Sequence, residues 1–126
     1  MSETEKKTTT REINTFELPE KLAELTGVKE VGLVTLTADE ELLCYKKSRG
    51  DNAKLSSELA KACLVESTAN DGTVKKLAAH DGTVDSYWKH CEPKLRQLVL
   101  QAYADLHAVE SEDTESFLKS RKLRVG

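Results

Sequence analysis

One stretch in the last third of the chain constrains the fold more than any other. Starting at residue 95, apolar side chains recur at offsets of 0, 3, 4, 7, 8 and 11: Leu95, Leu98, Val99, Ala102, Tyr103 and Leu106. This spacing places them on one face of an α-helix. Pro93 fits the first turn of that helix, where a backbone N–H has no intrahelical partner. The stripe predicts a helix packed against a folded body, with the off-stripe Leu100 at the margin of the buried face.

Two helices in the first half of the chain are marked by their caps. Thr37 and Glu40 have the spacing of a capping box, in which each side chain accepts a hydrogen bond from the other residue's backbone. That helix should end at Gly50. Asp51 is suited to cap a second helix over 52–65, whose apolar residues share one face: Leu55, Leu59, Ala62 and Cys63. The tight turn between these helices predicts a helical hairpin.

Shorter elements are indicated on both sides of this hairpin. Pro19 and Gly27 bracket a short helix over 20–25, because Pro suits the start of a helix and Gly its end. The segment 31–36 is short, β-branched and apolar on both faces, which predicts a strand. The string Asp-Gly-Thr-Val occurs twice in the middle of the chain. Since Asp-Gly favours tight turns, we expect a small β-hairpin or meander over 64–84.

Two further short helices are expected on either side of the apolar stripe. Asp85 is placed to cap the first, which carries Tyr87 and Trp88. Ser111 is placed to cap the second, which carries Phe117. Acidic residues in its first turn and basic residues at its end complement the helix dipole: Glu112, Asp113, Glu115, Lys119, Arg121 and Lys122.

The predicted fold class is therefore mainly α, of the α+β type. It combines a helical hairpin and C-terminal helices with a small β-hairpin or meander in the middle. The length of 126 residues suits one domain, which we place over 13–126. Residues 1–12 are polar and rich in Thr, which is typical of a flexible arm.

The composition argues against several classes of partner. The net charge is −3 and the pI about 5.7, whereas nucleic-acid binding needs clustered Lys and Arg; we therefore expect no nucleic acid. No apolar run approaches the ~20 residues of a membrane-spanning helix, and residues 1–7 lack the apolar core of a secretory signal. We therefore expect no membrane association. The odd, widely spaced set of cysteines suggests reduced thiols in a cytoplasm: Cys44, Cys63 and Cys91.

Side chains that carry enzyme chemistry do not form a recognisable pattern. His90 and Cys91 are adjacent, but a tetrahedral metal site needs four ligands and the other histidines are distant in sequence. Neither Asp-Gly turn has oxygen ligands at the spacing of a calcium loop. Nothing near Cys91 indicates an activated thiol, and no Gly-rich phosphate loop is present. We expect no catalytic residues, no metal and no cofactor, and a protein that is not an enzyme.

Protein binding is the remaining class, and its candidates are aromatic, apolar and basic side chains around the stripe. Tyr and Trp are enriched at interfaces, although Tyr87 and Trp88 also fit a core lid over the C-terminal helices. The basic cluster over 119–124 is expected to complete the last helix and contact acidic surface, with a phosphate backbone as the alternative. The candidate protein-binding residues are Tyr87, Trp88, Leu100, Tyr103, Phe117, Lys119, Arg121 and Lys122.

The order of these features resembles the tail assembly chaperones encoded in the tail gene clusters of tailed bacteriophages. The resemblance covers roughly residues 31–125 and is carried by four segments. The first is the helix start at 36–41, and the second is 88–98 with Trp88, Cys91 and Pro93. The third is 102–107 with Ala102, Tyr103, Leu106 and His107, and the fourth, after an acidic stretch, contains Ser116, Phe117, Leu118 and Ser120. Its motifs are patterns and not site signatures, so no functional residues transfer from the family.

The resemblance implies a helical protein in the cytoplasm of the infected host. Such a protein holds the tape-measure protein soluble and helps recruit tail-tube subunits; a homo-oligomer is left open. The alternative interpretation is a structural component of the mature virion, namely a head, neck or tail accessory protein. Both interpretations predict other phage structural proteins as partners.

Overall fold

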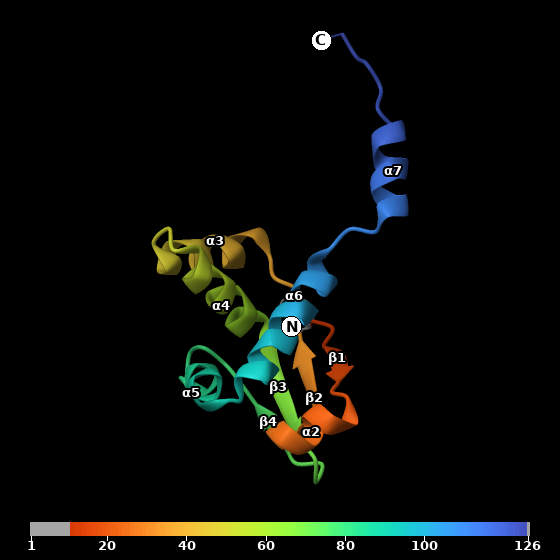
Figure 1. Cartoon of the computed structure of the whole chain (residues 1–126). Helices are drawn as coiled ribbons and strands as arrows, with labels where there is room; N and C mark the ends of the chain where they lie inside the picture. Colours follow the sequence, from red (N-terminus) through yellow and green to blue (C-terminus); the bar gives the residue numbers. More distant parts are fainter. Residues whose placement is uncertain (1–10, 126) are drawn as a thin grey trace, which may run out of the picture.

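The computed structural model describes residues 11–125, and all structural statements concern this range (Figure 1). Strands and helices are interspersed along the chain. Their order is β1 (Asn14–Glu17), α2 (Glu20–Thr26), β2 (Val28–Leu33), α3 (Ala38–Ser48), α4 (Asn52–Cys63), β3 (Leu64–Ala69), β4 (Val74–Lys76), α5 (Thr83–His90), α6 (Pro93–His107) and α7 (Ser111–Lys119). The α+β class is consistent with the prediction.

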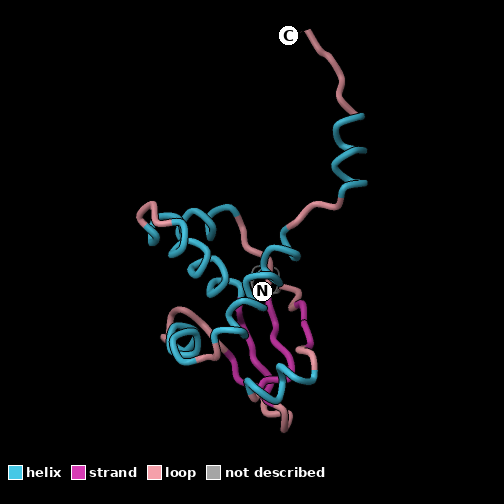
Figure 2. The backbone as a smooth tube through the Cα atoms, viewed as in Figure 1, coloured by secondary structure: helices cyan, strands magenta, loops and turns pink. Residues whose placement is uncertain are grey.

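The strands form one antiparallel sheet in the order β1-β2-β3-β4, which follows their order in the chain (Figure 2). Phe16, Val31, Ser67 and Lys75 lie opposite one another across the four strands. Val31 belongs to the core, Phe16 packs against it, and Ser67 lies within hydrogen-bond distance of Tyr87 in α5. This row therefore marks the face of the sheet that the helices cover.

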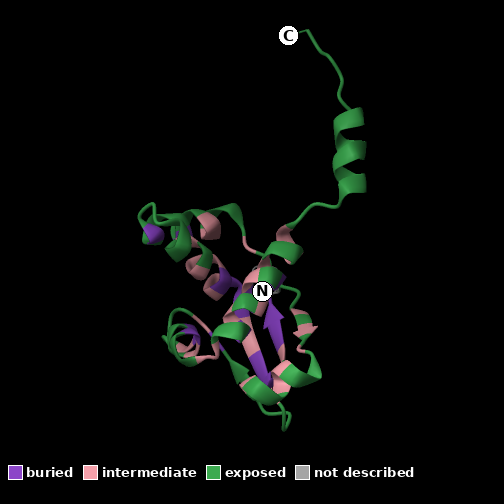
Figure 3. Cartoon of the chain, viewed as in Figure 1, coloured by how far each residue is buried: buried purple, intermediate pink, exposed green. Residues whose placement is uncertain are grey.

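The core lies between that face of the sheet and helices α4, α5 and α6 (Figure 3). The largest fully buried apolar side chains come from all these layers: Leu33, Cys63, Leu64, Val84, Leu95 and Val99. Most of the predicted stripe on α6 faces the core, because Leu95, Val99 and Ala102 are buried and Tyr103 and Leu106 pack against the core. Leu98 is half-buried. Helices α3 and α4 are consecutive and pack against each other, and α4 also contacts α6.

Local capping explains where several helices begin and end. Thr37 and Glu40 form the predicted capping box at the start of α3. Asp51 accepts a hydrogen bond from the Lys54 backbone at the start of α4. Gly27 ends α2 with a φ of 79°, a left-handed conformation that Gly adopts without a Cβ clash.

The sheet is larger than predicted. Strand β1 was not expected, because a single apolar residue, Phe16, gives four residues no readable alternation. The strand predicted over 31–36 is shifted, since β2 spans Val28–Leu33 and the Leu36 N–H donates instead to the His107 ring. Helix α4 ends at Cys63 and not at 65, because Leu64 begins β3 opposite Leu33. Tertiary pairing decides each of these boundaries.

The two Asp-Gly-Thr strings lie in different kinds of local structure. In both, the Asp carboxylate accepts a hydrogen bond from the Thr backbone two residues later. The first string, at Asp71, lies in the turn between β3 and β4. The second places Gly82 at the N-cap of α5, so the prediction of a meander reaching residue 84 was wrong. Asp85, predicted as the cap, lies inside the first turn of that helix.

The remaining predictions concern the two ends of the chain. Ser111 is the first residue of α7, with Glu110 at the cap, so the predicted Ser111 cap was wrong by one position. Most of the predicted arm over 1–12 lies outside the described residues. Arg11 is bonded to the folded body through the Thr35 carbonyl and the Glu40 carboxylate. Over residues 11–125, no helix has the length and apolar character needed to cross a membrane.

Candidate protein-binding surface

The segment over 108–125, here called the C-terminal arm, projects away from the folded body (Figure 1). All nine residues of α7 are exposed, in contrast to the stripe of α6 (Figure 3). Phe117 is 74% exposed and Leu118 is 64% exposed. Two adjacent large apolar side chains at this exposure indicate a surface available to a partner.

The geometry of the linker explains why α7 separates from α6. The Ala108 N–H bonds to the Asp105 carbonyl and closes the last turn of α6. Ala108 and Glu110 then both have extended backbone, with ψ angles of 149° and 146°. Extended residues cannot continue the helix, so α7 restarts as an independent element beyond Val109.

The arm also has a defined charge pattern. Glu112 and Asp113 occupy the first turn of α7, and Lys119 closes its last turn. Lys119, Arg121 and Lys122 are all exposed, immediately after the apolar pair. The structure therefore brings together four of the sequence-predicted binding residues on the arm, namely Phe117, Lys119, Arg121 and Lys122.

The other predicted binding residues lie in the folded body. Trp88 is only 7% exposed and belongs to the core cluster, so little of its side chain is open to a partner. The helix α5 packs that side chain inward because Val84 and Trp88 are one turn apart on the same face. Leu100 is half-buried and packs against the core, which leaves it little surface for a partner. The core-lid alternative therefore describes Trp88.

The two predicted tyrosines make hydrogen bonds inside the protein. The Tyr87 hydroxyl lies 2.6 Å from the Ser67 hydroxyl, which joins α5 to β3. The Tyr103 hydroxyl donates to the Glu41 carboxylate at 3.2 Å, which joins α6 to α3. Burial and the Glu41 carboxylate together raise the pKa of Tyr103 to about 12. Both side chains thus stabilise contacts between elements.

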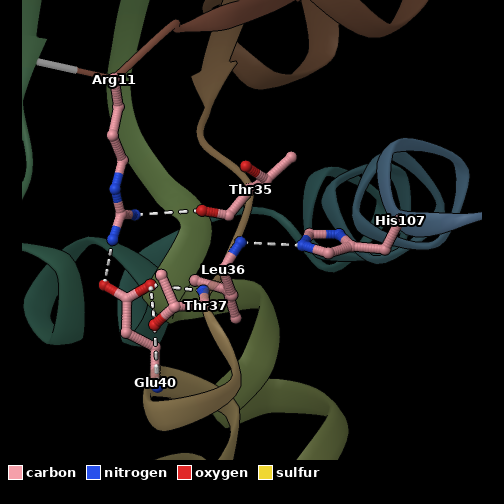
Figure 4. A network of polar contacts seen from close by, with 6 residues as sticks. All are labelled: Arg11, Thr35, Leu36, Thr37, Glu40 and His107. Carbon is pink, nitrogen blue, oxygen red and sulfur yellow. Dashed lines mark hydrogen bonds and ion pairs between the residues drawn. The ribbon is translucent and has the colours of Figure 1, made fainter.

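A polar network holds the chain between β2 and α3 in place (Figure 4). The Leu36 N–H donates to His107 Nε2 at 2.9 Å, while His107 Nδ1 lies 2.9 Å from the Tyr103 carbonyl. This pattern fits a neutral ring with its proton on Nδ1. Arg11 reaches the same segment through the Thr35 carbonyl. Sequence reasoning found the capping box but missed Arg11 and His107, because their partners are distant in sequence.

The described residues offer little for metal or thiol chemistry. No group of three or more His, Cys, Asp or Glu side chains within 11–125 is arranged to hold a metal ion. His90 Nδ1 lies 2.9 Å from the Ser86 carbonyl, and the Cys91 thiol contacts the Trp88 carbonyl. All three cysteines are free, and burial raises the pKa of Cys63 to about 12, which suppresses its thiolate form.

A second surface feature is a groove between β1 and α6, here called the β1–α6 groove. Its volume is about 290 Å³, and its apolar lining consists of Phe16, Leu18, Pro19, Val31, Leu98 and Ala102. Its charged lining residues are Glu17 and Asp105. The groove was missed at the sequence level because β1 was missed. The offsets of Leu98 and Ala102 were visible, but they indicated only core.

Comparisons of this chain with models of known protein families, with curated proteins and with solved structures give no match. The C-terminal arm and the β1–α6 groove are therefore the features on which its function is argued.

Proposed function

We propose that this chain is a non-enzymatic protein-binding protein of the tail assembly chaperone type. In this proposal it binds the tape-measure protein in the host cytoplasm and helps recruit tail-tube subunits. The observation that supports it best is the exposure of Phe117 and Leu118 on an arm outside the folded body. The arrangement of features between 31 and 125 that resembles those chaperones supports the choice of partner.

The physical chemistry of the arm suits reversible binding. Covering a Phe or Leu side chain contributes about 1.5–3 kcal/mol each, and part of that is offset by ordering the arm. A helix of nine residues is marginal in water without packing, so a partner surface would also stabilise α7. These terms give a modest affinity, which a chaperone needs because it must release its partner.

The charge pattern indicates the kind of surface that the arm would meet. Lys119, Arg121 and Lys122 follow the apolar pair and are exposed. A partner helix with an apolar face and acidic flanking residues would accept both parts, in the helix-in-groove manner that amphipathic segments use. Long helical proteins that must be kept soluble during assembly present such faces.

Co-expression with a tape-measure protein tests the proposal. We expect a soluble complex with the wild-type chain, and at least a tenfold loss of captured partner for Phe117→Ser combined with Leu118→Ser. Tyr45→Ser is the matched control, because Tyr45 is an exposed aromatic on α3, at 58% exposure. Equal capture by the arm variant and the wild type would contradict the assignment of the arm.

Mass spectrometry of purified particles separates this proposal from a virion component. A chaperone should be absent from the mature particle, since it leaves after assembly. A head, neck or tail accessory protein should be present in stoichiometric amounts.

A further inference from the structure

We propose that the β1–α6 groove receives Phe117 from the C-terminal arm of a second copy, so that the free protein forms an arm-exchanged dimer. Each copy would insert its arm into the groove of the other. The contact is isologous, which is the commonest geometry for dimers.

The groove matches an aromatic anchor in size and lining. Its floor is formed by core residues, since Val31 and Ala102 are nearly buried, and its walls come from Phe16 and Leu18 on one side and Leu98 on the other. A volume of about 290 Å³ is at the lower limit for a small-molecule site. One or two inserted side chains fill such a space, whereas a large cofactor does not fit.

The charges of groove and arm are complementary. Glu17 and Asp105 are the charged residues that line the groove. On the arm, Lys119 and Arg121 follow Phe117 within four residues. Charges at the rim of an interface set its register and partner choice more than its strength. The end of the arm from Phe117 onward therefore matches the groove in both apolar and charged parts, whereas the acidic first turn of α7 precedes this end.

Three other hollows on the folded body match less well. The hollow between α5 and β4 mixes Lys75 and His90 with Glu92. The one between α3, α4 and α5 mixes Lys47 and Lys61 with acidic residues, and Lys61 is already paired with Glu58 and Asp85. Neither hollow has the purely acidic charged lining that the basic end of the arm would meet in the β1–α6 groove. The hollow between α3 and α4 is apolar, but its charged residue Glu41 already accepts the Tyr103 hydrogen bond. It serves below as a control site.

The direction of the arm favours a second copy over the arm's own groove. Asp105 lies in the last turn of α6, so the groove ends where the arm begins. The extended linker then carries α7 away from the sheet and not back along α6 (Figure 1). If two copies meet at the C-terminal ends of their α6 helices, the arm of each copy reaches the open end of the other copy's groove.

The expected dimer is weak. Two exchanged Phe side chains bury roughly 300–500 Å² together, and the groove walls lose a similar area. The total approaches the lower limit for specific interfaces, about 1,000–1,200 Å². Sedimentation velocity should therefore be run on the purified chain from about 1 to 100 µM, around a micromolar Kd.

We expect the wild-type sedimentation coefficient to rise with concentration over that range. Phe117→Asp should remain monomeric, and Leu98→Asp should do the same from the groove side. Leu42→Asp, in the α3–α4 hollow, should dimerise like the wild type, because Leu42 is exposed and lies outside the groove. Circular dichroism of each variant checks that it is folded. A monomeric wild type, or a dimer insensitive to Phe117→Asp, would overturn the proposal.

Photo-crosslinking distinguishes the two copies from one. Benzoylphenylalanine is placed at position 117, and ¹⁴N- and ¹⁵N-labelled proteins are mixed in equal amounts. The peptide that contains position 117 should then be cross-linked to a peptide of residues 93–107, and some of these pairs should join a ¹⁴N peptide to a ¹⁵N peptide. Cross-links between peptides of the same isotope alone would show that the arm folds onto its own groove, and cross-links outside the groove would show another site; both contradict the exchange.

The dimer itself does not depend on the proposed function; only its expected role, covering the arm until a partner binds, rests on that function. Exchange would cover Phe117 and Leu118 until a tail protein displaces them. The sedimentation experiment uses the chain alone, so its failure leaves the partner-capture result intact, and a failed capture leaves the dimer intact.

Discussion

At the scale of single residues, Glu40 both completes the capping box of α3 and pairs with Arg11, and the substitution Glu40→Gln separates these two roles. Burial alone would raise the pKa of Glu40, but the hydrogen bonds from Thr37 and Arg11 and the Arg11 charge together hold that pKa below its ordinary value. A depressed carboxyl pKa stabilises the folded state above the ordinary value of 4.5, and this contribution is lost as the pH falls through the folded-state pKa.

Glu40→Gln keeps a residue suited to the capping box and removes the charge that pairs with Arg11. Both side chains are partly exposed, so we expect a loss of only about 0.2–1 kcal/mol at pH 7. Urea unfolding at pH 7 and at pH 3 measures it, and the difference from wild type should be smaller at pH 3, because pH 3 lies below the ordinary carboxyl pKa of 4.5. Arg11→Met should cost at least as much at pH 7, because it also removes the hydrogen bond to the Thr35 carbonyl, and it should cost less in the Glu40→Gln background than in the wild type. Additive losses would show that the two residues act separately.

At the scale of elements, the arm and the folded body are independent. Removing residues 109–126 should leave the free energy of unfolding within about 0.5 kcal/mol of wild type, because surface changes that touch no core contact rarely exceed this. Every residue of α7 is exposed, which is the reason for this expectation. Chemical unfolding followed by circular dichroism gives the comparison. A loss of several kcal/mol would mean that α7 packs on the body.

The same scale shows how much the sequence could predict. Helix boundaries set by local caps, such as Thr37 with Glu40 and Asp51, were readable because both partners lie within four residues. Strand β1 and the β1–α6 groove were not readable, because Phe16 acquires its environment only by pairing with Val31. Among the candidate binding residues, the sequence left Trp88 open between the core and a partner, since burial depends on what packs over a helix.

At the scale of the whole molecule, substitutions of Trp88 test whether this side chain serves the core or a partner. It is the one Trp of the chain and lies in the common core of sheet and helices. Trp88→Ala should cost about 3–5 kcal/mol, a large part of the 5–15 kcal/mol typical of small domains. Denaturant unfolding followed by circular dichroism measures this loss. Tyr45→Ala, at an exposed position, should change stability little.

Trp88→Phe keeps the core largely filled and is the variant for binding. Folded Trp88→Phe protein should capture the tape-measure protein as well as the wild type does. Loss of capture without loss of stability would restore Trp88 as a partner-binding residue.

The polar network of Arg11, Leu36, Glu40 and His107 at the start of α3, here called the clip, has a consequence for synthesis on the ribosome. Its parts, Arg11, Leu36 with Glu40, and His107, are spread over nearly the whole length of the folded body. Domains fold as units while synthesis adds about 5–20 residues per second, so the last part of the clip becomes available only after residue 107 has left the ribosome. The C-terminal arm follows immediately behind it. The exposed apolar side chains Phe117 and Leu118 therefore emerge only after every residue of this network has been made, and they spend little time beside an unfinished core.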